Sequence, residues 1–178
     1  MPNKLTNQVI LITGASSGIG ADAARLFAKE GCIVVLAARR VDRLTAIAEK
    51  IRLSGGQALV VPLDVAEQTQ IDDAVQTVLD TFGHIDILFN NAGFGYLDWL
   101  ERLDPAANID AQIDVNLRGV IRVTRAVLPS MLARRSLVIP WWFRPVLAFD
   151  TLFPGLVDWF LKVALVKRAH KLTIDDRS

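Results

Sequence analysis

The stretch that decides the fold is Val9–Gly20, which reads VILITGASSGIG. Its opening residues are mostly aliphatic and rich in valine and isoleucine, as in a strand buried on both faces. A glycine-rich turn follows, and a helical pattern starts at Gly18 and runs to about Glu30. A helix N-terminus behind glycines lets backbone N–H groups approach a phosphate, and the helix dipole favours the negative charge. The stretch therefore predicts a cradle for a nucleotide pyrophosphate.

Each glycine of this turn has an expected role. Gly14 permits the tight exit from the strand, Gly18 allows close approach to the phosphates, and Gly20 lets the helix pack closely on the sheet. The serine hydroxyls between them can add donors. An ordinary flexible turn is the alternative, but glycines placed between a buried strand and a helix favour phosphate binding. The candidate residues are Gly14, Ser16, Ser17, Gly18, Ile19 and Gly20.

Strand and helix patterns alternate along the chain. Apolar runs predict strands at about 8–13, 33–38, 58–63 and 85–90, and helical spacing predicts helices at about 18–30, 41–53, 67–82 and 106–132. This alternation predicts an α/β fold, a Rossmann-type doubly wound parallel sheet with helices on both faces. A complete domain of this kind has six strands in the order 3-2-1-4-5-6. Only the stub Leu137–Ile139, ended by Pro140, is left for a fifth strand, so we expect a truncated sheet.

Length and composition restrict the class of protein. A chain of 178 residues with 52% hydrophobic and 22% charged residues is expected to form one globular domain. A net charge of +1 gives no reason to expect nucleic acid as a partner. The single Cys32 excludes an internal disulfide, and with no secretory leader at the N-terminus it predicts a cytoplasmic protein. No metal-ligand cluster is found, and both histidines, His84 and His170, are expected at the surface.

Four motifs resemble one family. Thr13–Gly20, reading TGASSGIG, resembles the cofactor signature of the short-chain dehydrogenase/reductase family. Asn90–Gly93, reading NNAG, is similar to its second signature, Asp64–Val65 to its adenine-contacting pair, and Asn116 to its active-site asparagine. The motifs stand in the family order over residues 5–135. The resemblance implies a Rossmann fold, an NAD(P)(H) cofactor and carbonyl or alcohol substrates.

The resemblance also implies roles for residues beyond the glycine turn. Asp64 would accept a hydrogen bond from the adenine amino group, with a simple loop carboxylate as the alternative, and Val65 would cover the ring. Asn90 is expected to brace the sheet and the cofactor-side loop through its amide. Ala92 and Gly93 would leave room for the ribose and the nicotinamide.

The end of the second strand bears on the choice of cofactor. A carboxylate there would bind the ribose 2′-hydroxyl of NAD and repel a 2′-phosphate. That place holds Ala38, followed by Arg39 and Arg40, and a guanidinium suits a phosphate. We therefore expect NADP(H) rather than NAD(H), with Arg39 as the main contact. The alternative is that both arginines are solvated charges after a strand.

The catalytic half of the family pattern is not found. In the family, a serine and a tyrosine polarise the substrate carbonyl, and a lysine four residues after the tyrosine lowers its pKa. The asparagine matched by Asn116 anchors a water that leads to this lysine. The chain has one tyrosine, Tyr96, with Leu100 four residues later. Because a phenol has a pKa of about 10 in water and needs a nearby cation to act near neutral pH, we expect no catalysis of the family type. Asn116 is then a remnant.

The missing segment should begin near Ser136–Leu137. Two explanations stay open: an internal deletion that joins the cofactor half to the natural C-terminus, or a shorter fold selected as such. The expected function is a catalytically impaired NADP(H)-dependent oxidoreductase for carbonyl or alcohol substrates. A noncatalytic dinucleotide-binding module and a defective product that folds poorly are the alternatives.

A shift in composition suggests a boundary after Ser136. Residues 1–136 are predicted to form the NAD(P)-binding domain, and residues 137–178 an aromatic, basic tail. Apolar residues at helical spacing over about 151–169 predict an amphipathic helix in this tail. It would cover a substrate site, pack in a homo-oligomer or lie on a membrane surface, which leaves a membrane-peripheral location open. Asp158 and Lys162 interrupt the apolar stretch and argue against a spanning helix.

Overall fold

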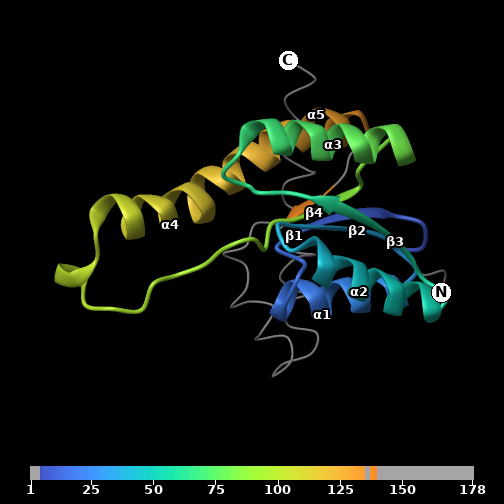
Figure 1. Ribbon diagram of the computed structural model, residues 1–178. Coiled ribbons are helices and arrows are strands. Elements are labelled where there is room, and N and C mark those ends of the chain that lie inside the picture. The colour runs from blue at the N-terminus through green and yellow to red at the C-terminus, as the bar shows by residue number, and fades with distance from the viewer. Residues whose placement is uncertain (1–4, 135–136, 140–178) are drawn as a thin grey trace, which may run out of the picture. The chain divides into compact units, whose positions relative to one another are not determined.

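Five parallel strands form one sheet in the order β3-β2-β1-β4-β5 (Figure 1). The computed structural model describes residues 5–134 and 137–139, so the predictions for 140–178 lie outside the described residues. The predicted doubly wound parallel sheet is confirmed, and the expected stub pairs with β4 as its fifth strand. The strands are β1 Val9–Thr13, β2 Ile33–Ala38, β3 Gln57–Pro62, β4 Ile87–Phe89 and β5 Leu137–Ile139.

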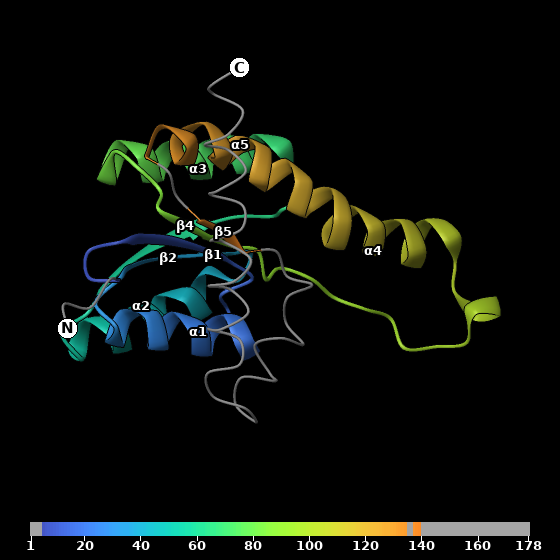
Figure 2. The same cartoon turned by 180° about the vertical axis from the view of Figure 1, so that it is seen from behind.

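Helices cover both faces of the sheet (Figures 1 and 2). On one face lie α1, Gly18–Lys29, and α2, Val41–Leu53. On the other lie α3, Gln68–Phe82, and α5, Val120–Arg134. The short connections and parallel strands place each helix antiparallel to the strand that it follows, as in other sheets of this class.

The apolar run of β1 is explained by two cores. Ile10 and Ile12 belong to the cluster under α1 and α2, which includes Leu44. Val9 and Leu11 belong to the cluster under α3 and α5. These four side chains are all fully buried. Because both faces of the strand are covered, the strand is apolar at successive positions rather than at alternate ones.

The strand predicted at 85–90 is shorter than expected, and β4 covers only Ile87–Phe89. Ahead of it, the Asp86 carboxylate accepts a hydrogen bond from the Val9 backbone N–H at 2.8 Å, and the Asp86 N–H donates to the Val9 carbonyl at 2.9 Å. The Asp86 carboxylate thus accepts a hydrogen bond that a backbone carbonyl would accept in a regular pair of strands. Ile85 is nevertheless fully buried, so its apolar character gave no hint of the boundary.

The prediction that His84 lies at the surface is wrong. Its side chain is 19% exposed, and its Nε2 lies 3.1 Å from Oδ2 of the buried Asp86. Its Nδ1 lies 2.7 Å from the carbonyl oxygen of Phe82. Both ring nitrogens are therefore engaged at the start of β4, at the edge of the sheet opposite the glycine turn.

The long helix predicted at 106–132 has the expected extent but not the expected form. Two wide, π-helical turns, η2 Pro105–Asp110 and η3 Asp114–Gly119, flank the single α-helical turn α4, Ala111–Ile113, and lead into α5. The Asp104 carboxylate caps the start by accepting from the Ala107 N–H. Each π-helical turn holds one residue more than an α-helical turn, and such turns are common near functional sites.

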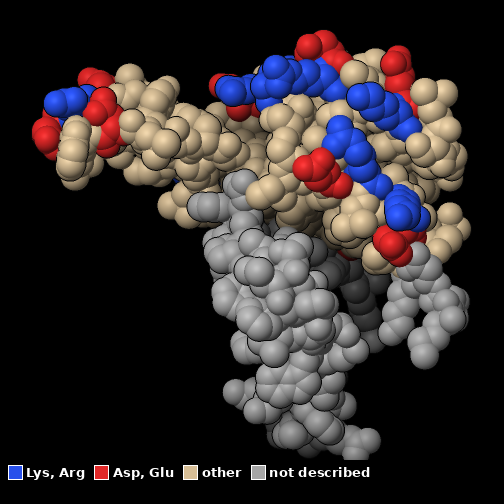
Figure 3. Space-filling model, turned by 90° about the horizontal axis from the view of Figure 1, so that it is seen from below, with Lys and Arg blue, Asp and Glu red and all other residues tan. Residues whose placement is uncertain are grey.

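Residues 94–119, which we call the arm, leave the sheet after β4 and return through η2, α4 and η3 (Figures 1 and 2). A short 3-10 turn, η1 Leu100–Arg102, lies near its tip. Leu97, Trp99 and Leu100 are exposed there. Seen from below, the arm carries charges at its tip and few along its flank, whereas cations and carboxylates lie close together on the rest of the described surface in this view (Figure 3). Within the described part of the chain, no helix is both long and apolar enough to cross a membrane.

Candidate functional site

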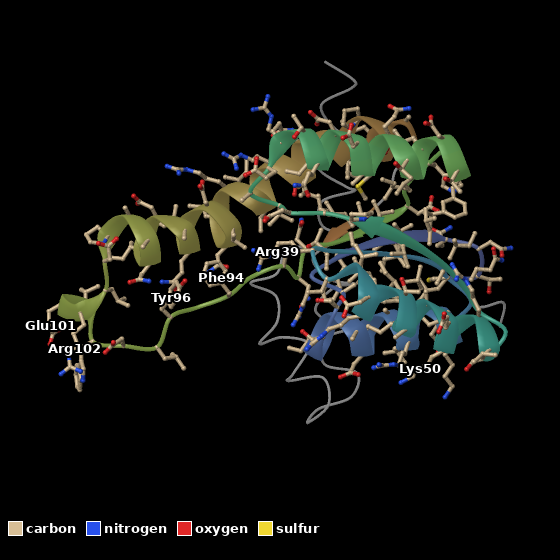
Figure 4. All side chains as sticks on the ribbon, viewed as in Figure 1. Arg39, Lys50, Phe94, Tyr96, Glu101 and Arg102 are labelled. Atoms are coloured by element: carbon tan, nitrogen blue, oxygen red, sulfur yellow. The ribbon has the colours of Figure 1, made fainter. Side chains whose placement is uncertain are left out.

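The predicted site residues converge on the carboxyl edge of the sheet. The glycine turn follows β1, the arginine pair follows β2, residues 64–65 follow β3 and residues 90–93 follow β4. Parallel strands bring these four loops to one edge, where ligands of open α/β sheets bind. Figure 4 shows Arg39 at this edge, with Phe94 and Tyr96 farther out along the arm.

The glycine turn has no room for side chains at two of its positions. A Cβ at Gly14 would lie 2.7 Å from the Ala92 Cα, and one at Gly20 would lie 2.5 Å from both the Gly14 carbonyl oxygen and the Asn91 Nδ2. Gly14 also has a φ of 65°, which favours glycine. Gly20 therefore makes room for the Gly14 carbonyl and the Asn91 side chain. The sequence predicted that Gly20 lets α1 pack closely on the sheet, but the atoms nearest to it belong to the turn and to Asn91.

The outer side of the turn is open. Gly18 has a φ of 55°, and a Cβ there would meet no atom within 4 Å. Ser17 precedes α1 but makes no capping bond, so its hydroxyl leaves the first N–H groups of the helix to other partners. Ile19 is half-exposed beside it. Open space in front of a helix N-terminus fits the pyrophosphate of a dinucleotide.

The two arginines after β2 have different surroundings. The Arg40 guanidinium donates to Ser16 Oγ from Nε and Nη2, at 3.2 and 2.9 Å, and from Nη2 to Ser17 Oγ at 2.8 Å. Arg39 is 71% exposed, and its Nη1 lies 3.5 Å from Asp64 Oδ2. Arg40 is thus bound to the glycine turn, while Arg39 is loosely paired and open to solvent.

The loop after β3 is held by its own hydrogen bonds. Asp64 Oδ1 accepts from the Ala66 N–H at 3.0 Å, and the Asp64 N–H donates to Gln70 Oε1 at 2.9 Å. The Asp64 side chain remains partly exposed, whereas Val65 is buried. A carboxylate at the surface above a buried aliphatic residue is compatible with one hydrogen bond to a purine edge and one apolar contact.

Two asparagines brace the end of β4. Asn90 Nδ2 donates to Thr124 Oγ1 on α5 at 3.1 Å. Asn91 Nδ2 lies 3.2 Å from the carbonyl oxygens of both Thr13 and Gly14. Thr13 Oγ1 in turn accepts from the N–H groups of Asn91 and Ala92, both at 3.0 Å. Together they tie β4 to the glycine turn and to α5.

The sequence reasoning missed Asn91 and Thr13 as site residues, although both stood inside the quoted motifs. The sequence predicts a bracing role for Asn90 alone, and the structure divides this role between the two asparagines. Asn91 Oδ1 is buried with no hydrogen-bond partner in the described part of the chain. This oxygen lies on the residue that contacts Gly20, so the orphaned acceptor is beside the cradle.

The Asn116 side chain is bonded to the backbone of Phe94, where the arm begins. Its Nδ2 donates to the Phe94 carbonyl at 2.7 Å, and its Oδ1 accepts from the Phe94 N–H at 3.0 Å. A Cβ at Gly93 would lie 3.0 Å from the same Oδ1. About one turn away, Gln112 Oε1 accepts from the Tyr96 N–H at 3.3 Å. Two amides thus hold residues 94–96 along the helical side of the arm.

Tyr96 has no lysine partner within residues 5–134 and 137–139. The residue is 47% exposed, and its ring packs edge-to-face on Phe94 with ring centroids 5.5 Å apart. The lysines of these residues, Lys29 and Lys50, lie on α1 and α2, and Figure 4 shows Lys50 far from Tyr96. The same residues hold no group of three or more potential metal ligands.

The sequence of the described residues matches one protein family. The family model for short chain dehydrogenases matches residues 8–139. The chain belongs to the short-chain dehydrogenase family. Its glycine turn, its paired asparagines and its parallel sheet are the parts of that family that the match covers.

Curated relatives in this family are longer than the chain. An oxidoreductase of Listeria innocua is 39% identical over 132 residues, which are 74% of this chain and 53% of the relative. A fatty acyl-CoA reductase of Mycobacterium tuberculosis is 40% identical over 134 residues, 75% of this chain and 46% of the relative. The chain therefore spans about half the length of these short-chain dehydrogenase relatives.

Solved structures of the family agree with the fold. An alcohol dehydrogenase from Thermococcus sibiricus, complexed with 5-hydroxy-NADP, superposes with a TM-score of 0.71 and 38% identity, covering 74% of this chain and 56% of that one. The L-sorbose reductase of Gluconobacter frateurii, complexed with NADPH and L-sorbose, has a TM-score of 0.70 and 37% identity, with coverage of 78% and 53%.

Proposed function

We propose that this chain binds NADP(H) at the carboxyl edge of the sheet and is impaired in hydride-transfer catalysis. The observation that carries the proposal is the glycine turn, in which Gly14 and Gly18 have positive φ and the space in front of Gly18 is open. Backbone N–H groups at the start of α1 would bind the pyrophosphate there. The NADP-type ligands of the solved neighbours support this choice of cofactor.

The arginine pair supports NADP(H) over NAD(H). Ala38 ends β2 where a carboxylate would repel a 2′-phosphate, and two guanidinium groups follow. We assign the 2′-phosphate to Arg39 because its guanidinium is exposed and its ion pair with Asp64 is loose, at 3.5 Å. A dianionic phosphate can replace this contact. Arg40 would keep the serines of the turn in place and add positive charge to the phosphate site.

The proposed impairment rests on the acidic group that must polarise the substrate carbonyl. Bound NADPH would supply the hydride, and the protein must polarise the carbonyl that receives it. The only tyrosine, Tyr96, has no cation four residues later and no lysine beside it in the described part of the chain. Asn116, which the family pattern assigns to the relay, has both amide atoms engaged with Phe94. Orientation of the cofactor remains, while polarisation of the substrate is lost.

Titration with NADPH and with NADH, followed by quenching of protein fluorescence, tests binding. We expect saturable binding that is tighter for NADPH, and no oxidation of NADPH in the presence of a panel of aldehydes and ketones. Turnover that tracks purified protein would contradict the impairment but not the binding. Soluble, folded protein that binds neither cofactor would refute the proposed function, and insoluble protein would favour a defective product.

A further inference from the structure

Gly119, the last residue of η3, lies directly against the loop that follows β3. It is buried, and a Cβ at this position would lie 2.8 Å from Val65 Cγ2 and 3.1 Å from both the Cβ and the carbonyl oxygen of Val65. The 2.8 Å contact is closer than two carbon atoms tolerate, and the two 3.1 Å contacts would require Val65 to move by a few tenths of an ångström. The absence of a side chain at 119 therefore lets Val65 occupy its place.

A second contact holds the same loop to the same helix. Arg122, about one turn after Gly119, donates from Nη1 to the Ala66 carbonyl at 2.7 Å. Its Nη2 lies 3.9 Å from Asp114, whose carboxylate also accepts from Arg118 at 2.9 Å. The helix therefore contacts Val65 by packing and Ala66 by a hydrogen bond, one residue apart in the loop.

The loop has little freedom to move away from this helix. Val65 is 6% exposed, and its neighbour Asp64 is tied through its N–H to Gln70 and through its carboxylate to the Ala66 N–H. A methyl group at 119 must then displace Val65, the loop backbone or the helix. Well-packed sites accommodate such an addition only with strain.

The same helical turn also contacts the other end of the site. Asn116, three residues before Gly119, holds the backbone of Phe94 through both of its amide atoms. One wide turn, η3, therefore contacts the loop after β3 and the segment after β4. Its position fixes the separation of these two loops along the carboxyl edge.

We propose that Gly119 is a positioning residue for the adenine half of the dinucleotide: its missing side chain lets Val65 seat under the adenine. The inference rests on the proposed NADP(H) function, and its ligand probe is 2′,5′-ADP, which carries the adenine and the 2′-phosphate without the nicotinamide. Gly119 acts through Val65 and need not touch the ligand.

The test compares 2′,5′-ADP affinities of the wild type, Gly119→Ala, Val65→Ala and the double variant by calorimetric titration. Gly119→Ala is expected to weaken binding about tenfold, since overpacking displaces the contact surface. Val65→Ala removes Cγ2, the atom nearest to the added methyl, and should weaken binding about threefold through lost apolar contact. In the double variant we expect the affinity of Val65→Ala, because the two residues are coupled. Multiplied losses in the double variant would show that Gly119 does not act through Val65.

Two further variants separate positioning from general loss of stability. Val78→Ala, on α3 and fully buried, creates a destabilised control that leaves the loop contacts intact, so its affinity should be unchanged while its urea midpoint falls. Arg122→Met keeps the aliphatic stem but removes the hydrogen bond to Ala66. It should weaken the binding of 2′,5′-ADP about threefold, and it tests the proposal even if Gly119→Ala does not fold. Wild-type affinity in both Gly119→Ala and Arg122→Met would overturn the inference, whereas a wild type that binds no 2′,5′-ADP would refute the proposed function instead.

Discussion

The side-chain amide of Asn116 makes both of its hydrogen bonds to the backbone of one residue, Phe94. The two residues are 22 positions apart in sequence, and the pair closes the base of the arm. The bond lengths, 2.7 and 3.0 Å, are those of good hydrogen bonds. An asparagine that the family pattern assigns to catalysis thus has a structural role in the described residues.

Replacing Asn116 should loosen residues 94–100. Asn116→Ala removes two partly buried hydrogen bonds, which contribute about 1 kcal/mol each. We expect faster chymotryptic cleavage after the aromatic residues of this segment and faster amide exchange at Phe94. Gln112→Ala, which removes the longer 3.3 Å bond to Tyr96, is the matched control and should have a smaller effect. Equal protection in all three proteins would show that the pair does not hold the arm.

Gly20 and Gly18 should respond differently to alanine. Gly20→Ala places a Cβ 2.5 Å from two atoms and should cost about 1–3 kcal/mol of unfolding free energy through overpacking. Gly18→Ala meets no neighbour, so only its positive φ is penalised, by about 1 kcal/mol. Urea unfolding gives both values. A larger loss in Gly18→Ala would contradict the assignment of Gly20 to the contact with Asn91.

Replacing each arginine by alanine should distinguish the residue that selects NADPH from the residue that holds the glycine turn. Arg39→Ala is expected to weaken NADPH about tenfold and leave NADH nearly unchanged, because a charge-assisted bond to the 2′-phosphate is lost. Arg40→Ala should weaken both cofactors, since its bonds to Ser16 and Ser17 hold the turn that both would use. Arg43→Ala, on the exposed side of α2, is the control for loss of charge. If Arg39→Ala lost as much affinity for NADH as for NADPH, the assignment of the 2′-phosphate to Arg39 would be wrong.

Alkaline pH should destabilise the protein through Cys32. Burial, together with the charges of Glu30 and Asp86, raises the pKa of this thiol from 9.0 to about 11. Between these values the unfolded chain releases the proton while the folded chain keeps it, so the unfolding free energy falls as the pH rises. Cys32→Ala removes this contribution, so its urea midpoint should fall less than that of the wild type between pH 9.0 and about pH 11, the window that the two pKa values set. Parallel pH profiles would show that the thiol ionises equally in both states.

Local patterns were sufficient for the first half of the fold. The run at 33–38 and the helical spacing at 41–53 predicted β2 and α2 with the observed bounds. Leu44, Ile47 and Ile51 are all buried, as expected for one face of a helix. These elements follow from burial, which the order of apolar residues reports directly.

The interior of the candidate site could not be predicted in the same way. The quoted motifs located the loops, but not that Asn91 bonds to the carbonyl oxygens of Thr13 and Gly14, because a hydrogen bond between distant loops leaves no periodic pattern. Ile113 and Leu117 continue the helical apolar spacing, yet both are exposed where the arm passes beyond the sheet. The wide turns of the arm depend on backbone hydrogen bonding that composition does not encode.

The wide turn at Asp114–Gly119 restricts changes of chain length in this stretch. Two of its residues contact different partners: Asn116 is bonded to Phe94, and Gly119 packs against Val65. Deleting one residue between them would turn the Asn116 side chain by about 100° around the helix axis relative to Gly119, away from Phe94. We therefore expect substitutions here to be tolerated more readily than single-residue indels, even though the stretch lies on a solvent-facing helix.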